Sequence, residues 1–238
     1  MSAIGKSFSG LRALHDVSFD VEAGTIVGLI GPNGAGKTTL FNVIAGRFAP
    51  TSGEVVFDDR VLTGLPPHRV AHAGVARTFQ LMRPFRTMTV AENVAIASYA
   101  SHSRRADALG AATAIIRRVG LETWADRLAT ELSTAGLKRL ELARALALQP
   151  RLLLLDEVLA GLSAAEREPL VDLLRELRED GMTMLLVEHV MAAVMAVSDQ
   201  ILVLHHGELL AAGTPATVTR DARVIEAYLG QGSNDADG

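Results

Sequence analysis

Hydrophobic and polar positions follow two patterns along this chain, and each pattern predicts one kind of element. Continuous apolar runs at 25–31, 151–155 and 182–187 predict strands that are buried on both faces. Apolar positions spaced three or four residues apart at 37–47 and 163–180 predict helices. Because strands and helices alternate, we expect an α/β fold with a doubly wound parallel sheet.

The middle of the chain has a different pattern. Between 89 and 149 the strand-like runs disappear, and alanine-rich helical patterns replace them at 90–100, 106–119 and 134–148. This pattern predicts a helical insert and excludes a second sheet in that stretch.

The C-terminal part returns to strand-like patterns. After a short helix that follows His189, the segment 200–210 predicts a hairpin that turns at 206–207. The last eight residues, 231–238, are polar, and we expect them to be disordered. We therefore expect one domain over 1–230, in which a core at 1–79 and 150–230 encloses a helical subdomain at 80–149.

Composition narrows the possible classes of protein. A chain of 238 residues with 49% hydrophobic content can bury a core without disulfides, and it contains no cysteine for a disulfide or thiolate metal site. The net charge of −4 gives no overall basic field, so we expect no nucleic-acid partner. No run approaches the roughly 18 apolar residues of a membrane span, so we expect any membrane association to depend on a partner protein.

The segment Gly31-Pro-Asn-Gly-Ala-Gly-Lys-Thr-Thr39 matches the phosphate-loop pattern G-x-x-x-x-G-K-[ST]. Its glycines allow the backbone to curl around an anion, Lys37 supplies a charge for the β- and γ-phosphates, and the Thr38 hydroxyl can ligate Mg²⁺. An ordinary glycine turn is the alternative, which the preceding strand and following helix disfavour. We expect the nucleotide to contact Gly31, Asn33, Gly34, Gly36, Lys37, Thr38 and Thr39.

Two carboxylates follow the four leucines at 152–155. At the carboxyl end of a buried parallel strand, Asp156 would hold Mg²⁺ through water and Glu157 would orient the attacking water. A core strand followed by a solvated acidic turn is the alternative. Proximity to a phosphate loop favours the first interpretation, since phosphoryl transfer needs both groups near the γ-phosphate.

The order of these motifs resembles that of an ATP-binding-cassette (ABC) ATPase along nearly the whole chain. The resemblance rests on Phe8, the phosphate loop, Gln80, Leu132-Ser133, Asp156-Glu157 and His189. It implies a P-loop NTPase fold with a RecA-like parallel core, an antiparallel β subdomain and a helical signature subdomain, and it implies ATP and Mg²⁺ as cofactors.

The resemblance also implies roles for individual residues. Phe8 would stack on adenine, although a core phenylalanine is its alternative interpretation. Gln80 would contact Mg²⁺ and the attacking water and report the nucleotide state to a transmembrane partner. His189 would contact the γ-phosphate, and with Lys37, Gln80 and Glu157 it would complete the catalytic set. Only seven residues precede Phe8, so we expect either a trimmed first subdomain or an earlier start.

The signature segment departs from the family pattern. The family has Leu-Ser-Gly-Gly-Gln, whereas this chain has Leu132-Ser-Thr-Ala-Gly136. Ser133 keeps the hydroxyl that would bind the nucleotide of a partner subunit, but the Cβ atoms of Thr134 and Ala135 would crowd the approach to the γ-phosphate. We therefore expect an asymmetric dimer, in which the site that this chain completes for its partner turns over slowly.

Further motifs resemble the ATPase subunits of bacterial branched-chain amino acid importers, whose relatives carry amides, urea and other hydrophobic amino acids. They lie at 76–80, 88–93, 187–191 and 207–215. The resemblance implies a second ATPase subunit, with a heterodimer favoured, two transmembrane permeases and, indirectly, a periplasmic solute-binding protein. It places the chain at the cytoplasmic face of the inner membrane. A regulatory nucleotide-sensing cassette and a soluble non-transport ABC ATPase remain as alternatives.

Overall fold

A six-stranded sheet forms the centre of the computed structural model, which describes residues 1–79, 83–100, 102 and 104–229. The strand order is β11-β10-β3-β9-β8-β7, and all neighbours are parallel except β10 and β11, which form an antiparallel hairpin. The strands are β3 (Ile26–Ile30), β7 (Val75–Arg77), β8 (Leu152–Asp156), β9 (Thr183–Val187), β10 (Gln200–His205) and β11 (Glu208–Gly213).

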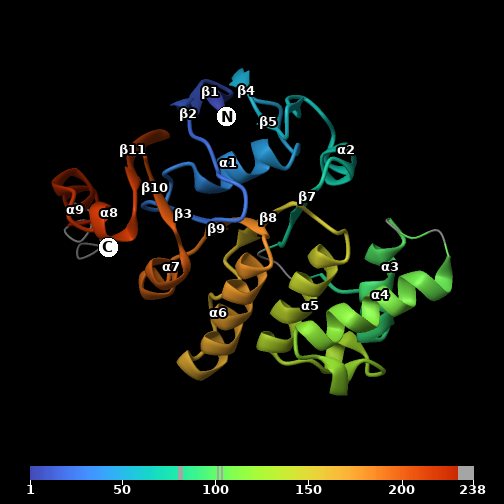
Figure 1. Cartoon of the computed structure of the whole chain (residues 1–238). Helices are drawn as coiled ribbons and strands as arrows, with labels where there is room; N and C mark the ends of the chain where they lie inside the picture. Colours follow the sequence, from blue (N-terminus) through green and yellow to red (C-terminus); the bar gives the residue numbers. More distant parts are fainter. Residues whose placement is uncertain (80–82, 101, 103, 230–238) are drawn as a thin grey trace.

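Helices cover both faces of this sheet, which explains why its central strands are apolar throughout. Successive side chains point to opposite faces, so Leu154 packs with helix α1 (Lys37–Ile44) while Leu153 packs with helix α6 (Ala164–Glu179). Helix α7 (Met191–Val197) lies on the same face as α6, opposite α1 (Figure 1). Because the helices cover the two faces of the sheet, a ligand would reach the sheet at the edge where the carboxyl ends of the parallel strands lie.

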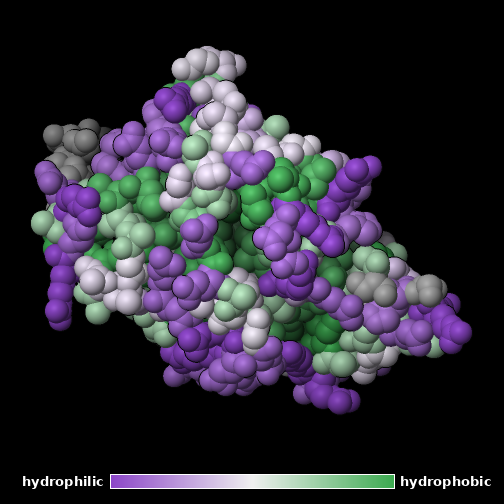
Figure 2. All heavy atoms as spheres, turned by 45° about the horizontal axis from the view of Figure 1, so that its top comes forward, coloured by the Kyte–Doolittle hydropathy of each residue, from purple (hydrophilic) through white to green (hydrophobic). Residues whose placement is uncertain are grey.

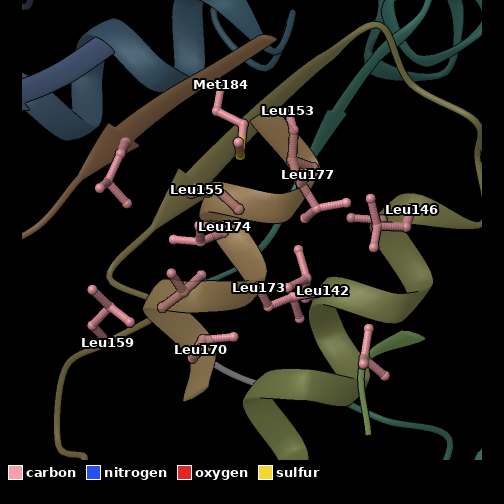
Figure 3. Packing of buried hydrophobic residues seen from close by; sticks show 14 of the residues in the cluster. Leu142, Leu146, Leu153, Leu155, Leu159, Leu170, Leu173, Leu174, Leu177 and Met184 are labelled. Atoms are coloured by element: carbon pink, nitrogen blue, oxygen red, sulfur yellow. The ribbon is translucent and has the colours of Figure 1, made fainter. Parts of the chain in front are cut away.

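Three further helices form a group beside the sheet (Figure 1). They are α3 (Val90–Ser98), α4 (Arg105–Arg118) and α5 (Thr134–Leu146). Leucines of α5 and α6 point toward one another, among them Leu142 and Leu173 (Figure 3), and both belong to the buried cluster beneath the sheet. The shared cluster fixes α5 relative to the ends of β8 and β9.

A smaller antiparallel sheet lies on the side of α1 (Figure 1) and has the strand order β2-β1-β4. Its strands are β1 (Ser2–Phe8), β2 (Leu11–Val17) and β4 (Ser52–Glu54), and a two-stranded ribbon of β5 (Val56–Phe57) and β6 (Arg60–Val61) follows. The remaining short elements are α2 (Pro67–His72), α8 (Pro215–Val218), α9 (Ala222–Leu229) and two 3-10 turns at Glu122–Trp124 and Ala129–Glu131.

The structure confirms the central strands and the hairpin turn at 206–207, and it confirms the helices expected between 89 and 149. The helix expected at 37–47 is three residues shorter and ends at Ile44, because Gly46 adopts a φ of 71°, a conformation common just after a helix.

Polar side chains cover most of the face shown in Figure 2, with apolar side chains between them. Among the described residues, no helix is long and apolar enough to cross a bilayer. The expectation of disorder at 231–238 lies outside the described residues.

Candidate functional site

The phosphate loop at 31–36 leaves β3 and enters α1. Gly31 has a φ of 153°, and a Cβ there would lie 2.1 Å from the carbonyl oxygen of Leu204, so only glycine fits this approach of the loop to β10. No described side chain caps α1, whose N-cap is Gly36, so its first amides remain available to an anion. Asn33, Gly34 and Thr38 are exposed, and Gly36 and Thr39 are partly buried.

Lys37 lies over this loop. Its Nζ donates to the carbonyl oxygens of Gly31 at 2.6 Å and Pro32 at 2.9 Å. Burial lowers the pKa of Lys37, and the negative charge of Glu157 opposes that shift. Both of these acceptors are neutral carbonyl groups, so a phosphate oxygen would give the buried ammonium a stronger, charge-assisted bond.

Asp156 ends β8 and lines a pocket of about 520 Å³ together with Thr38, Asn42 and Arg77. One guanidinium nitrogen of Arg77, Nη2, donates to Asp156 Oδ2 at 2.6 Å, and Nη1 donates to Asn42 Oδ1 at 2.6 Å. The Asp156 backbone N–H donates to the hydroxyl of Thr78 at 3.1 Å. Arg77 at the end of β7 and Thr78 directly after it thus hold Asp156, and Asn42 of α1 in turn holds Arg77.

Glu157 and His189 meet at the ends of the neighbouring parallel strands β8 and β9. His189 Nε2 lies 2.9 Å from Glu157 Oε1, and the Glu157 backbone N–H donates to the carbonyl oxygen of Val187 at 2.9 Å. Glu157 has a φ of 52°, in the left-handed region that residues other than glycine rarely adopt. The sequence predicted a role for each residue separately, and the structure brings the two side chains into contact.

Among the residues that the structure describes, Phe8 and Ser133, which the sequence also predicted to bind nucleotide, have no hydrogen bond to the groups above. Phe8, at the end of β1, is 38% exposed and packs edge-on against Phe48, with the ring centroids 5.3 Å apart. Ser133 is the N-cap of α5, where its Oγ accepts from the Gly136 backbone N–H at 3.2 Å. No hydrogen bond within the described part of the chain joins Phe8 or Ser133 to the phosphate loop. Gln80 lies outside the described residues.

Several polar residues at the site escaped the sequence analysis. Arg77 belongs to a motif used for the family resemblance, but its spacing gave no sign of a bond to Asp156. Tyr228 of α9 reaches the phosphate loop: burial raises the pKa of its hydroxyl, and a hydrogen bond with the Gly31 backbone opposes the rise. Lys138 and Glu188 contact the segment around Glu157 from a helix and from the end of β9. These contacts depend on tertiary packing, so no local pattern predicts them.

The site fits a phosphate group that carries a metal ion. Free amides at the start of α1 and the Lys37 ammonium suit the phosphate. A hydroxyl at Thr38 and a carboxylate at Asp156 line one pocket and supply the oxygen ligands that Mg²⁺ prefers. Within the described residues, no cluster of three His, Asp or Glu side chains could hold a metal ion, so an ion here would also need phosphate oxygens.

Comparison with known proteins gives matches over most of the chain. The ABC transporter family model matches residues 14–160, and the model described as branched-chain amino acid ATP-binding cassette transporter matches residues 208–233. The high-affinity branched-chain amino acid transport ATP-binding protein LivG of Salmonella typhimurium is 42% identical over 94% of both chains. The corresponding protein BraF of Pseudomonas aeruginosa is 39% identical over 97% of both chains.

Solved structures share the fold. An ATP-binding cassette of an ABC transporter in its ADP conformation superimposes with a TM-score of 0.87 at 32% identity and covers 96% of this chain and 97% of its own. The fold is therefore that of a P-loop NTPase cassette, and the expected fold class is confirmed. Because the family match spans more than half of the chain and the identity to LivG extends over 94% of it, the chain belongs to the ABC transporter family of ATP-binding subunits.

Proposed function

We propose that this chain is the ATP-binding and ATP-hydrolysing subunit of an importer for branched-chain or other hydrophobic amino acids or related amides. The observation that carries the proposal is the 2.9 Å contact between His189 Nε2 and Glu157 Oε1. This pair lies near the phosphate loop, since the charge of Glu157 affects the pKa of Lys37. The similarity to LivG and BraF supports the solute class.

Each residue of the site has a distinct task in this proposal. The amides of the phosphate loop and the Lys37 ammonium would bind the β- and γ-phosphates. Thr38, Asp156 and Gln80 would hold Mg²⁺, which when bound would neutralise charge on the phosphate oxygens. Glu157 orients the attacking water and accepts its proton, and His189 keeps the Glu157 carboxylate in place.

The site is completed by a second cassette. Ser133 begins a helix whose first amides can bind the nucleotide of a partner subunit, and Phe8 provides a partly exposed ring for the adenine. We favour a heterodimer. The altered signature of this chain would complete a slow ATP site on the partner, and a regular signature on the partner would complete a fast ATP site on this chain. Two permeases bind this dimer at the cytoplasmic face of the inner membrane, and they receive the solute from a periplasmic binding protein.

Affinity purification from detergent-solubilised membranes of the native host tests the proposal. We expect mass spectrometry to find two permeases and a second cassette with the tagged chain, and none of these in a purification from the untagged strain. Recovery of the chain only from the soluble fraction, without membrane partners, would contradict the proposal and favour a non-transport ABC ATPase.

A regulatory cassette with little turnover is the second candidate, and the first turn of α5 is the observation that favours it. Thr134 and Ala135 occupy that turn directly after Ser133, where the family has two glycines. Steady-state ATP hydrolysis by the purified complex separates the candidates, since a nucleotide sensor would bind ATP without sustained release of phosphate.

A further inference from the structure

A buried polar cluster lies directly behind Glu157 and brings together three parts of the fold. Helix α5 contributes Lys138, the residue before His189 contributes the Glu188 carboxylate, and the chain after β8 contributes the backbone groups of Glu157 and Leu159. The cluster has no role in the proposed catalytic steps described above.

Two short hydrogen bonds define the cluster. Lys138 Nζ donates to the carbonyl oxygen of Glu157 at 2.5 Å, and Glu188 Oε1 accepts from the Leu159 backbone N–H at 2.5 Å. Lys138 is 9% exposed and Glu188 is 1% exposed. Both side chains therefore fix the backbone on either side of residue 158, immediately after the carboxylate that orients water.

Lys138 and Glu188 carry opposite charges, and each charge opposes the pKa shift that burial causes in the other group. Burial lowers the pKa of Lys138, and the charges of Glu188 and then Glu157 oppose that shift. Burial raises the pKa of Glu188, which the Leu159 N–H and then the Lys138 charge oppose. Glu188 Oε2 is buried without a hydrogen-bond partner in the structure, so the Lys138 charge adds to the compensation that the Leu159 N–H gives this carboxylate.

The backbone that Lys138 holds is strained. Glu157 has a φ of 52°, a left-handed conformation in which a Cβ crowds the following carbonyl oxygen. It persists only where surrounding contacts determine it. The bond to Lys138 fixes the peptide plane after Glu157, and the bond from Glu157 N–H to Val187 fixes the plane before it.

We propose that Lys138 is a positioning residue that sets the direction of the Glu157 carboxylate by holding its peptide carbonyl, with Glu188 as the buried counter-charge that keeps Lys138 in place. The inference rests on the proposed hydrolysis at Glu157. Lys138 lies five residues after Ser133 on the same helix. A movement of α5 would therefore shift Lys138 and, through its bond to the Glu157 carbonyl oxygen, the Glu157 carboxylate.

The test compares ATP hydrolysis by the purified complex with Lys138→Met, Lys138→Arg and Arg139→Met. Arg139 is the matched control, since it follows Lys138 on α5 and donates to a backbone carbonyl, that of Val119, away from the strand ends. We expect Lys138→Met to lower kcat at least tenfold with the KM for ATP within twofold of wild type. We expect Lys138→Arg to recover most of that loss, and Arg139→Met to keep both constants within twofold.

A second pair of variants tests the counter-charge and remains informative if Lys138→Met folds poorly. Glu188→Gln keeps an acceptor for Leu159 and removes the charge, and we expect it to lower kcat severalfold at unchanged KM. Since the two residues act as a unit, the double variant Lys138→Met/Glu188→Gln should lose no more activity than Lys138→Met alone.

Several results would overturn the inference. These are a wild-type kcat for Lys138→Met, an equal loss for Arg139→Met, or no recovery with Lys138→Arg. A wild-type complex that binds ATP and does not hydrolyse it would contradict the proposed function itself. If the wild type hydrolyses ATP and the Lys138→Met variant does so at the same rate, the proposed function stands and only the positioning role of Lys138 is refuted.

Discussion

Replacing Arg77 with methionine should destabilise the protein strongly, because it removes one partner of a buried ion pair. The Arg77 side chain is 10% exposed and that of Asp156 is 6% exposed, and the two form a hydrogen-bonded ion pair at 2.6 Å. The pair joins β7 to β8, and a second bond joins Arg77 to Asn42 on α1. Methionine retains much of the apolar contact of the Arg77 stem and lacks its charge.

The expected magnitude follows from the carboxylate that would remain. Removing one partner of a buried pair costs about 3 to 5 kcal/mol, because the other charge stays buried without compensation. The buried Arg77 Nε has no hydrogen-bond partner in the structure. Its removal relieves an unfavourable burial and so offsets part of the loss of stability. We therefore expect a loss of about 3 kcal/mol in the free energy of unfolding, a large part of the roughly 5 to 15 kcal/mol of a typical domain.

Urea unfolding followed by circular dichroism measures this difference. Arg175→Met is the matched control, because Arg175 pairs with Asp172 on the surface of α6, with side-chain exposures of 45% and 57%, and should cost about 0.5 kcal/mol or less. The double variant Arg77→Met/Asp156→Asn should recover part of the loss, since it removes the unpaired charge. Equal effects of Arg77→Met and Arg175→Met would refute this reasoning about the buried pair.

Two further changes test the nucleotide site. Lys37→Ala should reduce the affinity for ATP at least tenfold, measured by calorimetry, because it removes the ammonium that we propose to bind the phosphates; unchanged affinity would exclude Lys37 from phosphate binding. Replacing Thr134 and Ala135 together with glycine should raise the ATP turnover of the reconstituted transporter, because it removes two Cβ atoms from the first turn of α5. Turnover equal to that of the wild type would reject the idea of a slow site.

Strand β8 and the antiparallel sheet show where sequence patterns were sufficient and where they were not. All five residues of β8 are buried, so an apolar run identified it directly. In contrast, all three residues of β4 are exposed, and only Ile4 and Gly5 of β1 are fully buried. Those strands form through pairing with each other, and a hydrophobic pattern contains little information about such pairing. The family resemblance, which included an antiparallel subdomain, supplied what the pattern lacked.

The same contrast holds within the site. The phosphate loop could be predicted because its motif consists of consecutive residues, whereas the approach of the Leu204 carbonyl to Gly31 appears only in the folded chain. The contact of Lys138 with Glu157 could not, because it depends on where the packing of α5 places a side chain relative to the end of β8. Contacts between distant elements of this kind follow from tertiary packing alone.

The most direct test of ATP hydrolysis at this site is to compare the wild-type complex with the Glu157→Gln variant for both ATP binding and phosphate release. Glutamine preserves the size of the side chain and an oxygen that His189 can contact, but it cannot accept a proton from water. We expect ATP affinity within a few-fold of wild type and phosphate release reduced at least about 100-fold, the contribution typical of a general base. Phosphate release at the wild-type rate would show that Glu157 does not activate the water and would contradict the catalytic site described here.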